Sequence, residues 1–269
     1  MPAPALVMIA PGSGDPRVAQ VTHCLRAGLS ELRPEIVVRA AFLDRFPPAP
    51  YQVVEELAAA DVAEVVFVPL ELAHAIEVDD TITGLVASCR ERFREMNFVA
   101  SRPVGPELNL LTILDERLRS ALAAARVLEL DGLVLSAESS GDVRGSALLA
   151  RRARQWSTHH RLPCLTAVAD GTGPSVAQAI QGLRSQGRRH IAVGSFFLTS
   201  DASYHAQADQ ALRCGAVAVS DPIGPCQEVS ELVIARYAFA AMDLLDFEQR
   251  HTAFDPIFDE DDELDWETA

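Results

Sequence analysis

Short apolar runs rich in β-branched residues alternate with amphipathic segments along almost the whole chain, and this alternation is the strongest constraint on its fold. The strand-like runs cover 6–10, 36–43, 64–72, 97–104, 131–137, 163–169, 190–198 and 216–223. The helix-like segments lie near 16–32, 50–61, 80–95, 107–125, 143–159, 174–186, 203–213 and 225–245. Strict alternation of strand and helix favours parallel sheets that are covered by helices on both faces. The sequence therefore predicts an α/β protein.

The second half of the sequence repeats three landmarks of the first half in the same order. The pairs are "LVMIAPGSGDPR" (6–17) with "LVLSAESSGDVR" (133–144), "EVVFVPLELAHAIEV" (64–78) with "HIAVGSFFLTSDASY" (190–204), and "SRPVGPELNLL" (101–111) with "SDPIGPCQEVS" (220–230). The partners are separated by 127, 126 and 119 residues, so their spacing is nearly constant. Ordered self-similarity of this kind indicates two homologous half-domains.

We expect each half-domain to hold a four-stranded parallel sheet flanked by helices. The predicted boundaries are 1–128 for the first half, 129–245 for the second and 246–269 for an acidic tail. Ligands of such folds bind beyond the carboxyl ends of the strands, so two facing halves would form a cleft between them. The loops expected at this cleft are 10–17, 72–80, 137–144 and 198–205.

The charge of the chain is unevenly distributed. The formal net charge is −15, and the segment from Asp243 onward holds eleven acids and one arginine, which leaves −10 in that segment. Because this segment is also poor in core-forming residues and contains Pro256, we expect a disordered or loosely docked tail. The rest has neither a basic stripe nor an aromatic ladder, so we expect no nucleic-acid partner.

The composition also bears on where the protein acts. No apolar run reaches the roughly 20 residues that cross a bilayer, and "MPAPALVMIA" lacks the basic flank of a signal peptide, so we expect no membrane association. The five cysteines are widely spread without a CxxC pair. That pattern favours free thiols in a reducing compartment, and we expect a cytoplasmic protein.

Four ordered motifs in the first half carry a resemblance to a known family. The order "APGSGDPR", "AFLDRFPP", "VVFVPLELA" and "RPVGPELNLL" resembles the sirohydrochlorin chelatases, class II chelatases of siroheme and cobalamin biosynthesis. The likeness covers most of 5–125 and, more weakly, 131–245, as in the internally duplicated members. It implies a lyase that inserts Fe(II) or Co(II), as substrate metal, into a carboxylate-rich tetrapyrrole without an organic cofactor. The oligomeric state stays open.

The first half departs from the family at its metal-binding histidines. The histidine of the first loop corresponds to Pro11, which has no metal-binding atom. A second family histidine corresponds to Glu77, with His74 one helical turn earlier. Imidazole suits Fe(II) and Co(II), and carboxylates bind the same ions as harder donors. The resemblance therefore implies Glu77 and His74 as metal ligands and as catalytic groups.

The second half departs from the family at the same places. Its counterpart of the first-loop histidine is Glu138, which the resemblance implies as a further catalytic carboxylate. An acid at the end of a strand is also an ordinary N-cap for the next helix. The counterpart of the second histidine is Ser203, followed by Tyr204 and His205, and we interpret His205 as a surface residue rather than a displaced ligand.

The pattern Ser-x-Asp-x-Arg recurs in the first loop of both halves. We expect Ser13, Arg17, Ser140 and Arg144 to bind the substrate, because the planar guanidinium of arginine holds carboxylates in a bidentate manner. The alternative is a turn that caps the following helix. Two further histidines, His159 and His160, lie at a predicted helix end where imidazolium suits the helix dipole, and we assign them no site.

The loss of the family histidines from both halves also favours a different class of protein. A catalytically degenerate pseudo-chelatase would keep the fold and act as a tetrapyrrole or metal carrier, or as a partner of an active enzyme. A third reading is an altered chelatase with another metal or macrocycle. The "GSGDPR" loop favours binding of some kind, whereas Pro11 counts against the ordinary chemistry.

Overall fold

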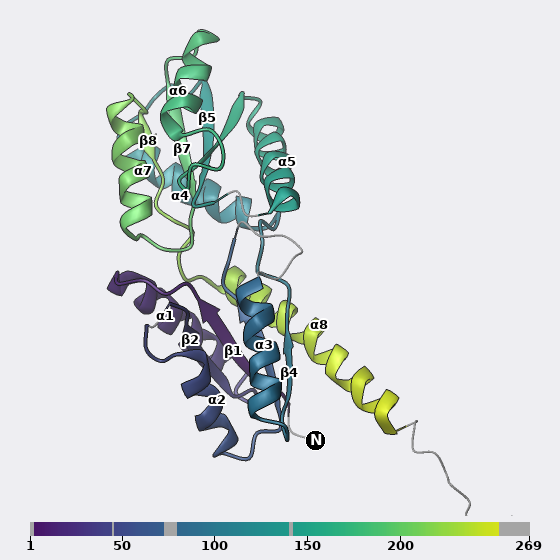
Figure 1. Cartoon of the computed structure of the whole chain (residues 1–269). Helices are drawn as coiled ribbons and strands as arrows, with labels where there is room; N and C mark the ends of the chain where they lie inside the picture. The colour runs from purple at the N-terminus through teal and green to yellow at the C-terminus, as the bar shows by residue number, and fades with distance from the viewer. Residues whose placement is uncertain (1–2, 45, 73–79, 140–141, 253–269) are drawn as a thin grey trace, which may run out of the picture.

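The computed structural model describes residues 3–44, 46–72, 80–139 and 142–252, and these residues form two parallel four-stranded sheets (Figure 1). The first sheet holds β1 (Ala5–Ala10), β2 (Val38–Phe42), β3 (Glu64–Pro69) and β4 (Asn97–Ala100), in the order β2-β1-β3-β4. The second holds β5 (Gly132–Ala137), β6 (Cys164–Val168), β7 (Ile191–Phe196) and β8 (Ala218–Val219), in the order β6-β5-β7-β8. The predicted fold class is therefore confirmed. That the two halves arose by duplication stays a prediction.

Every helix-like segment of the sequence contains a helix. The helices are α1 (Pro16–Leu32), α2 (Pro50–Ala58), α3 (Asp80–Arg92), α4 (Leu110–Ala124), α5 (Val143–His160), α6 (Val176–Ser185), α7 (Ala202–Arg213) and α8 (Gln227–Thr252). The last helix continues seven residues past its predicted end at 245 and so takes in the start of the predicted tail. No glycine or proline interrupts the sequence between the ends of α8, so nothing local stops it earlier.

The two sheets exchange the helices that follow their last strands. Although α4 follows β4 of the first sheet, it packs on β7 and β8 of the second. Likewise α8 follows β8, yet it packs on β3, β4 and α1, and it runs along the lower lobe in Figure 1. We therefore define the first lobe as the first sheet with α1, α2, α3 and α8, and the second lobe as the second sheet with α4 to α7. The boundary near residue 128, predicted from the repeat, divides the sequence into halves that do not coincide with these lobes, and it stays a prediction.

Two similar segments carry the chain between the lobes. Each contains a glycine followed by proline, and both glycines have left-handed backbones, with φ of 73° at Gly105 and 72° at Gly224. A side chain would strain that conformation, so the repeated "VGP" and "IGP" of the sequence mark the crossings.

Arginines of the exchanged helices hold these crossing segments. Arg236 of α8 donates hydrogen bonds to the carbonyl oxygens of Pro103 at 2.8 Å and Val104 at 3.1 Å. Arg117 of α4 donates to the carbonyl oxygen of Ile223 at 3.2 Å. Each crossing is thus tied to a helix that comes from the opposite half of the sequence.

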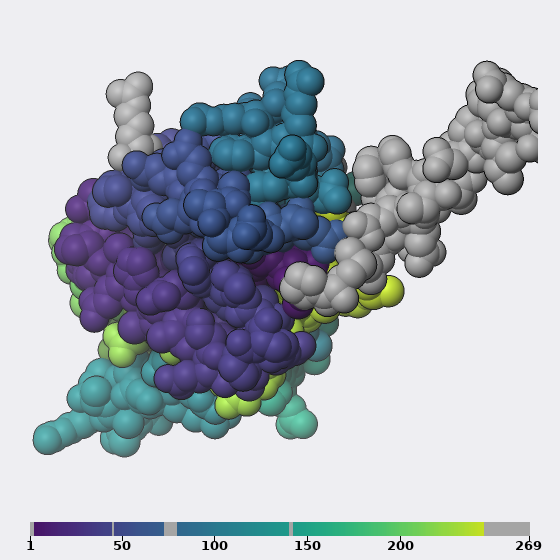
Figure 2. Space-filling view, turned by 90° about the horizontal axis from the view of Figure 1, so that it is seen from below, coloured from purple at the N-terminus to yellow at the C-terminus, as the bar shows by residue number. Residues whose placement is uncertain are grey.

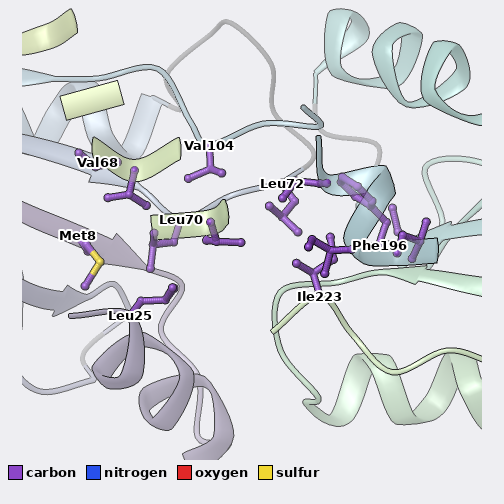
Figure 3. Close-up of a cluster of buried hydrophobic side chains, with 14 of the residues drawn as sticks. Met8, Leu25, Val68, Leu70, Leu72, Val104, Phe196 and Ile223 are labelled. Carbon is purple, nitrogen blue, oxygen red and sulfur yellow. The ribbon is translucent and has the colours of Figure 1, made fainter. Parts of the chain in front are cut away.

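A single buried cluster of apolar side chains joins the lobes. Figure 3 shows it extending from Met8 and Val68 of the first sheet through Leu72 to Phe196 and Ile223 of the second lobe. Seen from below, purple to blue elements of the first lobe cover most of the visible face, with yellow atoms of α8 at its edges (Figure 2). Because burial of apolar area is the main stabilising contribution to folding, this shared cluster holds the two carboxyl-end edges together.

Among the residues that the structure describes, no helix combines the length and the apolar character needed to span a membrane.

Candidate functional site

A cavity of about 310 Å³ lies where the carboxyl ends of strands from both sheets meet. Its wall includes Pro11 after β1, Glu71 after β3, Glu138 after β5, Asp170 after β6 and Phe197 after β7. Its volume is at the lower end of the range for ligand pockets, about 300–1,000 Å³. The predicted cleft between the two sheets is therefore present, and its lining combines apolar side chains with carboxylates.

Glu138 is the predicted catalytic residue that the structure places in this cavity. It directly follows the buried strand residue Ala137, and its side chain is exposed to the cleft. The pKa of Glu138 is raised above the ordinary glutamate value, first because surrounding protein atoms desolvate the carboxylate, and then because Asp201, Glu71 and Asp170 repel its charge. A carboxylate in such surroundings binds a proton or a cation more readily than one in water.

The backbone around Glu138 fixes the relation between two of the cleft loops. Its carbonyl oxygen accepts hydrogen bonds from the amides of Ala169 at 3.2 Å and Asp170 at 3.1 Å. The loop after β6 therefore lies against the loop after β5, and two carboxylates face the same cavity.

The first loop of the first half forms a helix cap. Asp15 is the N-cap residue of α1, and the Arg17 guanidinium donates to its two carboxylate oxygens at 2.8 and 2.6 Å. The Asp15 amide donates to the Ser13 hydroxyl oxygen at 3.1 Å. Hydrogen bonds from the side chain and the amide of Arg17 lower the pKa of Asp15 to about 2. Ser13 and Arg17 thus have the capping geometry that was the alternative to substrate binding, and a substrate carboxylate would compete with Asp15 for Arg17.

The same loop meets the start of α7 in the second lobe. The amide of Ala202 contributes to the low pKa of Asp15, and the charge of Asp201 contributes to the raised pKa of Arg17. Asp201 is itself the N-cap of α7 and accepts from the amide of Tyr204 at 2.9 Å. This contact brings loops from the two lobes to one edge of the cleft.

The other predicted site residues lie away from the described cavity lining or outside the described residues. Arg144 lies exposed in the first turn of α5. Residues His74, Glu77 and Ser140 lie outside the described residues; the first two belong to the stretch between Leu72, which lines the cavity, and the start of α3. His205 is exposed, as interpreted from the sequence, with its Nε2 atom 3.3 Å from the Ser200 hydroxyl.

Three cleft carboxylates were not predicted from the sequence, namely Glu71, Asp170 and Asp201. Asp201 falls within an expected cleft loop, and Glu71 lies one residue before another. Asp170 begins the "DGTG" loop and follows the predicted strand 163–169. Both Glu71 and Asp170 are the second residue after their strands, β3 and β6, and the position of an acid near the carboxyl end of a strand is the signal that could have identified them.

Comparisons with known proteins agree with this architecture. Residues 5–121 match the family model CbiX. The chain is similar to SirB from Bacillus subtilis with Fe3+, at 16% identity and a TM-score of 0.70, covering 91% of this chain and 98% of that one. It is also similar to the sirohydrochlorin chelatase SirB from Bacillus subtilis subspecies spizizenii in complex with cobalt, at 14% identity and a TM-score of 0.73, with coverages of 90% and 96%.

A third solved structure, CbiX, the terminal enzyme for biosynthesis of siroheme in denitrifying bacteria, matches at 20% identity and a TM-score of 0.57, covering 88% of this chain and 99% of that one. No curated protein sequence matches the chain. The fold is therefore that of the two-lobed class II chelatases. Residues 5–121 match the CbiX family model, which agrees with the family resemblance noted in the sequence.

Proposed function

We propose that the protein is a chelatase that inserts Fe(II) or Co(II), as substrate metal, into a carboxylate-rich tetrapyrrole of the sirohydrochlorin type. The observation that carries the proposal is the position of Glu138: a carboxylate with a raised pKa stands in the inter-lobe cavity where the family resemblance implies a metal-holding histidine. One of the two similar SirB structures holds Fe3+ and the other is a complex with cobalt, which supports a metal-binding cleft in this fold.

The carboxylates of the cleft supply a site for the incoming ion. Glu71, Glu138 and Asp170 line one cavity, and their mutual repulsion is relieved when a divalent cation binds among them. Carboxylates are harder donors than imidazole, so His74 from the family resemblance would add the softer nitrogen ligand that suits Fe(II) and Co(II), and Glu77 would add a further carboxylate.

Metal insertion also needs a proton acceptor. Two pyrrole N–H groups each lose a proton as the metal ion forms bonds to the ring nitrogens, so two protons must leave the macrocycle. Glu138 is suited to accept one proton, release it to the solvent of the cleft and then accept the second, because its raised pKa brings its basicity closer to the working pH. In this proposal Glu138 is the catalytic base.

The acidic side chains of the macrocycle would be bound at the helix starts around the cleft. Arg144 is exposed at the start of α5, and Arg17 can turn from Asp15 to a substrate carboxylate of equal charge. Ser13 and Ser140 would add hydroxyl donors. The proposal includes a cytoplasmic location, which the five free cysteines favour.

One observation favours a second candidate function. Pro11 lines the cavity at the position of the first-loop histidine and offers no donor to a metal. A protein that binds the tetrapyrrole or the metal without inserting one into the other would keep this cleft and lack catalysis.

Anaerobic spectrophotometry of the full chain with sirohydrochlorin and Fe(II) or Co(II) separates the two functions. A chelatase accelerates insertion over the uncatalysed rate, and Glu77→Ala abolishes the acceleration. A shift of the tetrapyrrole absorption without acceleration would instead establish a carrier. An unchanged spectrum would contradict both the chelatase and the tetrapyrrole carrier.

A further inference from the structure

Three metal-ligating side chains meet where the end of α5 packs against α4. Asp115 of α4 lies between His159 and His160 of α5, with His160 Nε2 2.7 Å from Asp115 Oδ1 and His159 Nε2 3.5 Å from Asp115 Oδ2. One ligand atom from each residue can be chosen so that all lie within 4.8 Å of one another. The two imidazoles thus face one carboxylate, although 44 residues of sequence separate Asp115 from His159.

These separations match those around a small divalent ion. Zinc lies about 2.0–2.2 Å from nitrogen and oxygen ligands, which puts two ligand atoms of a tetrahedral site roughly 3.3 Å apart. The separations of 2.7 and 3.5 Å between the imidazole nitrogens and the Asp115 oxygens fall on either side of that value. Small rotations of the two imidazoles would therefore admit an ion, with a fourth position left for water.

The carboxylate is already oriented for this role. Asp115 is buried, and the indole N–H of Trp156 donates a hydrogen bond to its Oδ1 atom at 2.5 Å. The Trp156 ring is fully buried and packs edge-on against the imidazole of His160, with ring centroids 5.6 Å apart. Such contacts behind a ligand fix its direction and raise metal affinity.

The position also suits a cation and is open to solvent. His159 and His160 form the last turn of α5, where the helix dipole favours positive charge. A cavity of about 290 Å³ reaches Asp115 and His159 from outside, so an ion has a path to both.

We propose that Asp115, His159 and His160 form a second metal site that is separate from the cleft and takes a borderline divalent ion such as Zn(II) or Co(II). Two imidazoles and a carboxylate are donors of the type that these ions prefer. The start of α5 lies at the cleft, and a rise of about 1.5 Å per residue puts His160 roughly 25 Å further along the helix. The ion would tie the exchanged helix α4 to α5 and so stabilise the second lobe.

Titration of the metal-free full chain with Co(II), without tetrapyrrole, tests this site. The visible ligand-field bands report the coordination, and pulsed EPR of the Cu(II) form counts the bound imidazoles. We expect His159→Ala to weaken binding at this site at least tenfold and to reduce the imidazole count from two to one. His159 is the decisive position because its side chain is 66% exposed, so its removal leaves the packing intact.

Two control variants locate the binding. His190→Ala removes an imidazole that also lies near carboxylates, 3.6 Å from Glu129 and 3.8 Å from Asp131, and it should leave the Co(II) titration unchanged. Glu138→Gln alters the cleft and should leave the two-imidazole signal in place. The proposal is overturned if His159→Ala binds Co(II) like the wild type, or if the two-imidazole signal disappears in Glu138→Gln.

Discussion

At the scale of single residues, the surroundings of Glu138 oppose the charge of its carboxylate. Its carboxylate is partly desolvated and lies near three other acids, so its charged form is disfavoured in the folded chain. Functional sites commonly keep such groups at a cost in stability.

We expect Glu138→Gln to be more stable than the wild type at neutral pH. Because the pKa of Glu138 is raised, the folded chain binds the proton more tightly than the unfolded chain does. The wild-type free energy of unfolding therefore falls as the pH rises from the ordinary glutamate pKa through the raised one, and the neutral glutamine escapes this loss. Urea denaturation at pH 7 and near pH 4 measures the difference, which should vanish at the lower pH. Equal stabilities at pH 7 would argue against the acidic surroundings of Glu138.

The sequence predicted a site residue only where its own local motif was recognisable. Glu138 was found because it ends a recognisable strand in a repeated motif. Its neighbours Asp170 and Asp201 come from other loops, and their effect on its pKa depends on distances in space. Asp115 and His159 were missed for the same reason, since neither sequence neighbourhood contains the other.

At the scale of elements, the sequence predicted all the strands and helices that the structure describes, but several predicted strands are too long, above all the last strand of each sheet. The apolar runs 97–104 and 216–223 continue past β4 and β8. The extra residues Val104 and Ile223 are buried, yet they belong to the core between the lobes and not to a sheet. Hydrophobicity alone does not distinguish a buried strand from a buried crossing segment.

The packing of α5 on the second sheet depends on a glycine. A Cβ atom at Gly194 of β7 would lie 2.4 Å from Cη2 of Trp156, whose ring is buried and hydrogen-bonded to Asp115. We expect Gly194→Ala to lower the free energy of unfolding by about 1–3 kcal/mol through overpacking.

The same substitution in α3 provides a matched control. A Cβ atom at Gly84 would meet nothing within 4 Å, so Gly84→Ala should raise the free energy of unfolding by about 0.5–1 kcal/mol. Urea denaturation of both variants checks the pair. If both substitutions changed the free energy of unfolding in the same direction, the helix packing around Gly194 would differ from the one described.

At the scale of the whole molecule, the exchange of α4 and α8 joins the lobes and sets the cleft between them. This exchange could not be predicted, because each helix follows its strand like any other helix of an α/β fold. The lobes are consequently interdependent, and each crossing segment carries part of the connection.

Arg236 is the contact through which α8 holds the first crossing. It donates to two backbone carbonyl groups and pairs with Glu107 in the same segment. We expect Arg236→Met to cost about 1.5–3 kcal/mol, the range for hydrogen bonds that involve a charged group. Arg236→Lys should recover part of this, because it keeps the charge but not the planar fork. The free energy of unfolding of each variant is measured by urea denaturation. Equal values for Arg236→Met and the wild type would refute this role.

The pH dependence of kcat/KM for anaerobic metal insertion, compared between the wild type and Glu138→Gln, tests the central claim of a carboxylate-centred chelatase most directly. For the wild type, we expect the rate to fall on acidification at a pH above the ordinary glutamate pKa, because the free enzyme then loses the basic form of Glu138. Glu138→Gln should be at least about 100-fold slower and should lack this acid limb. A variant with the wild-type rate and the wild-type pH profile would contradict the claim that Glu138 acts in this reaction.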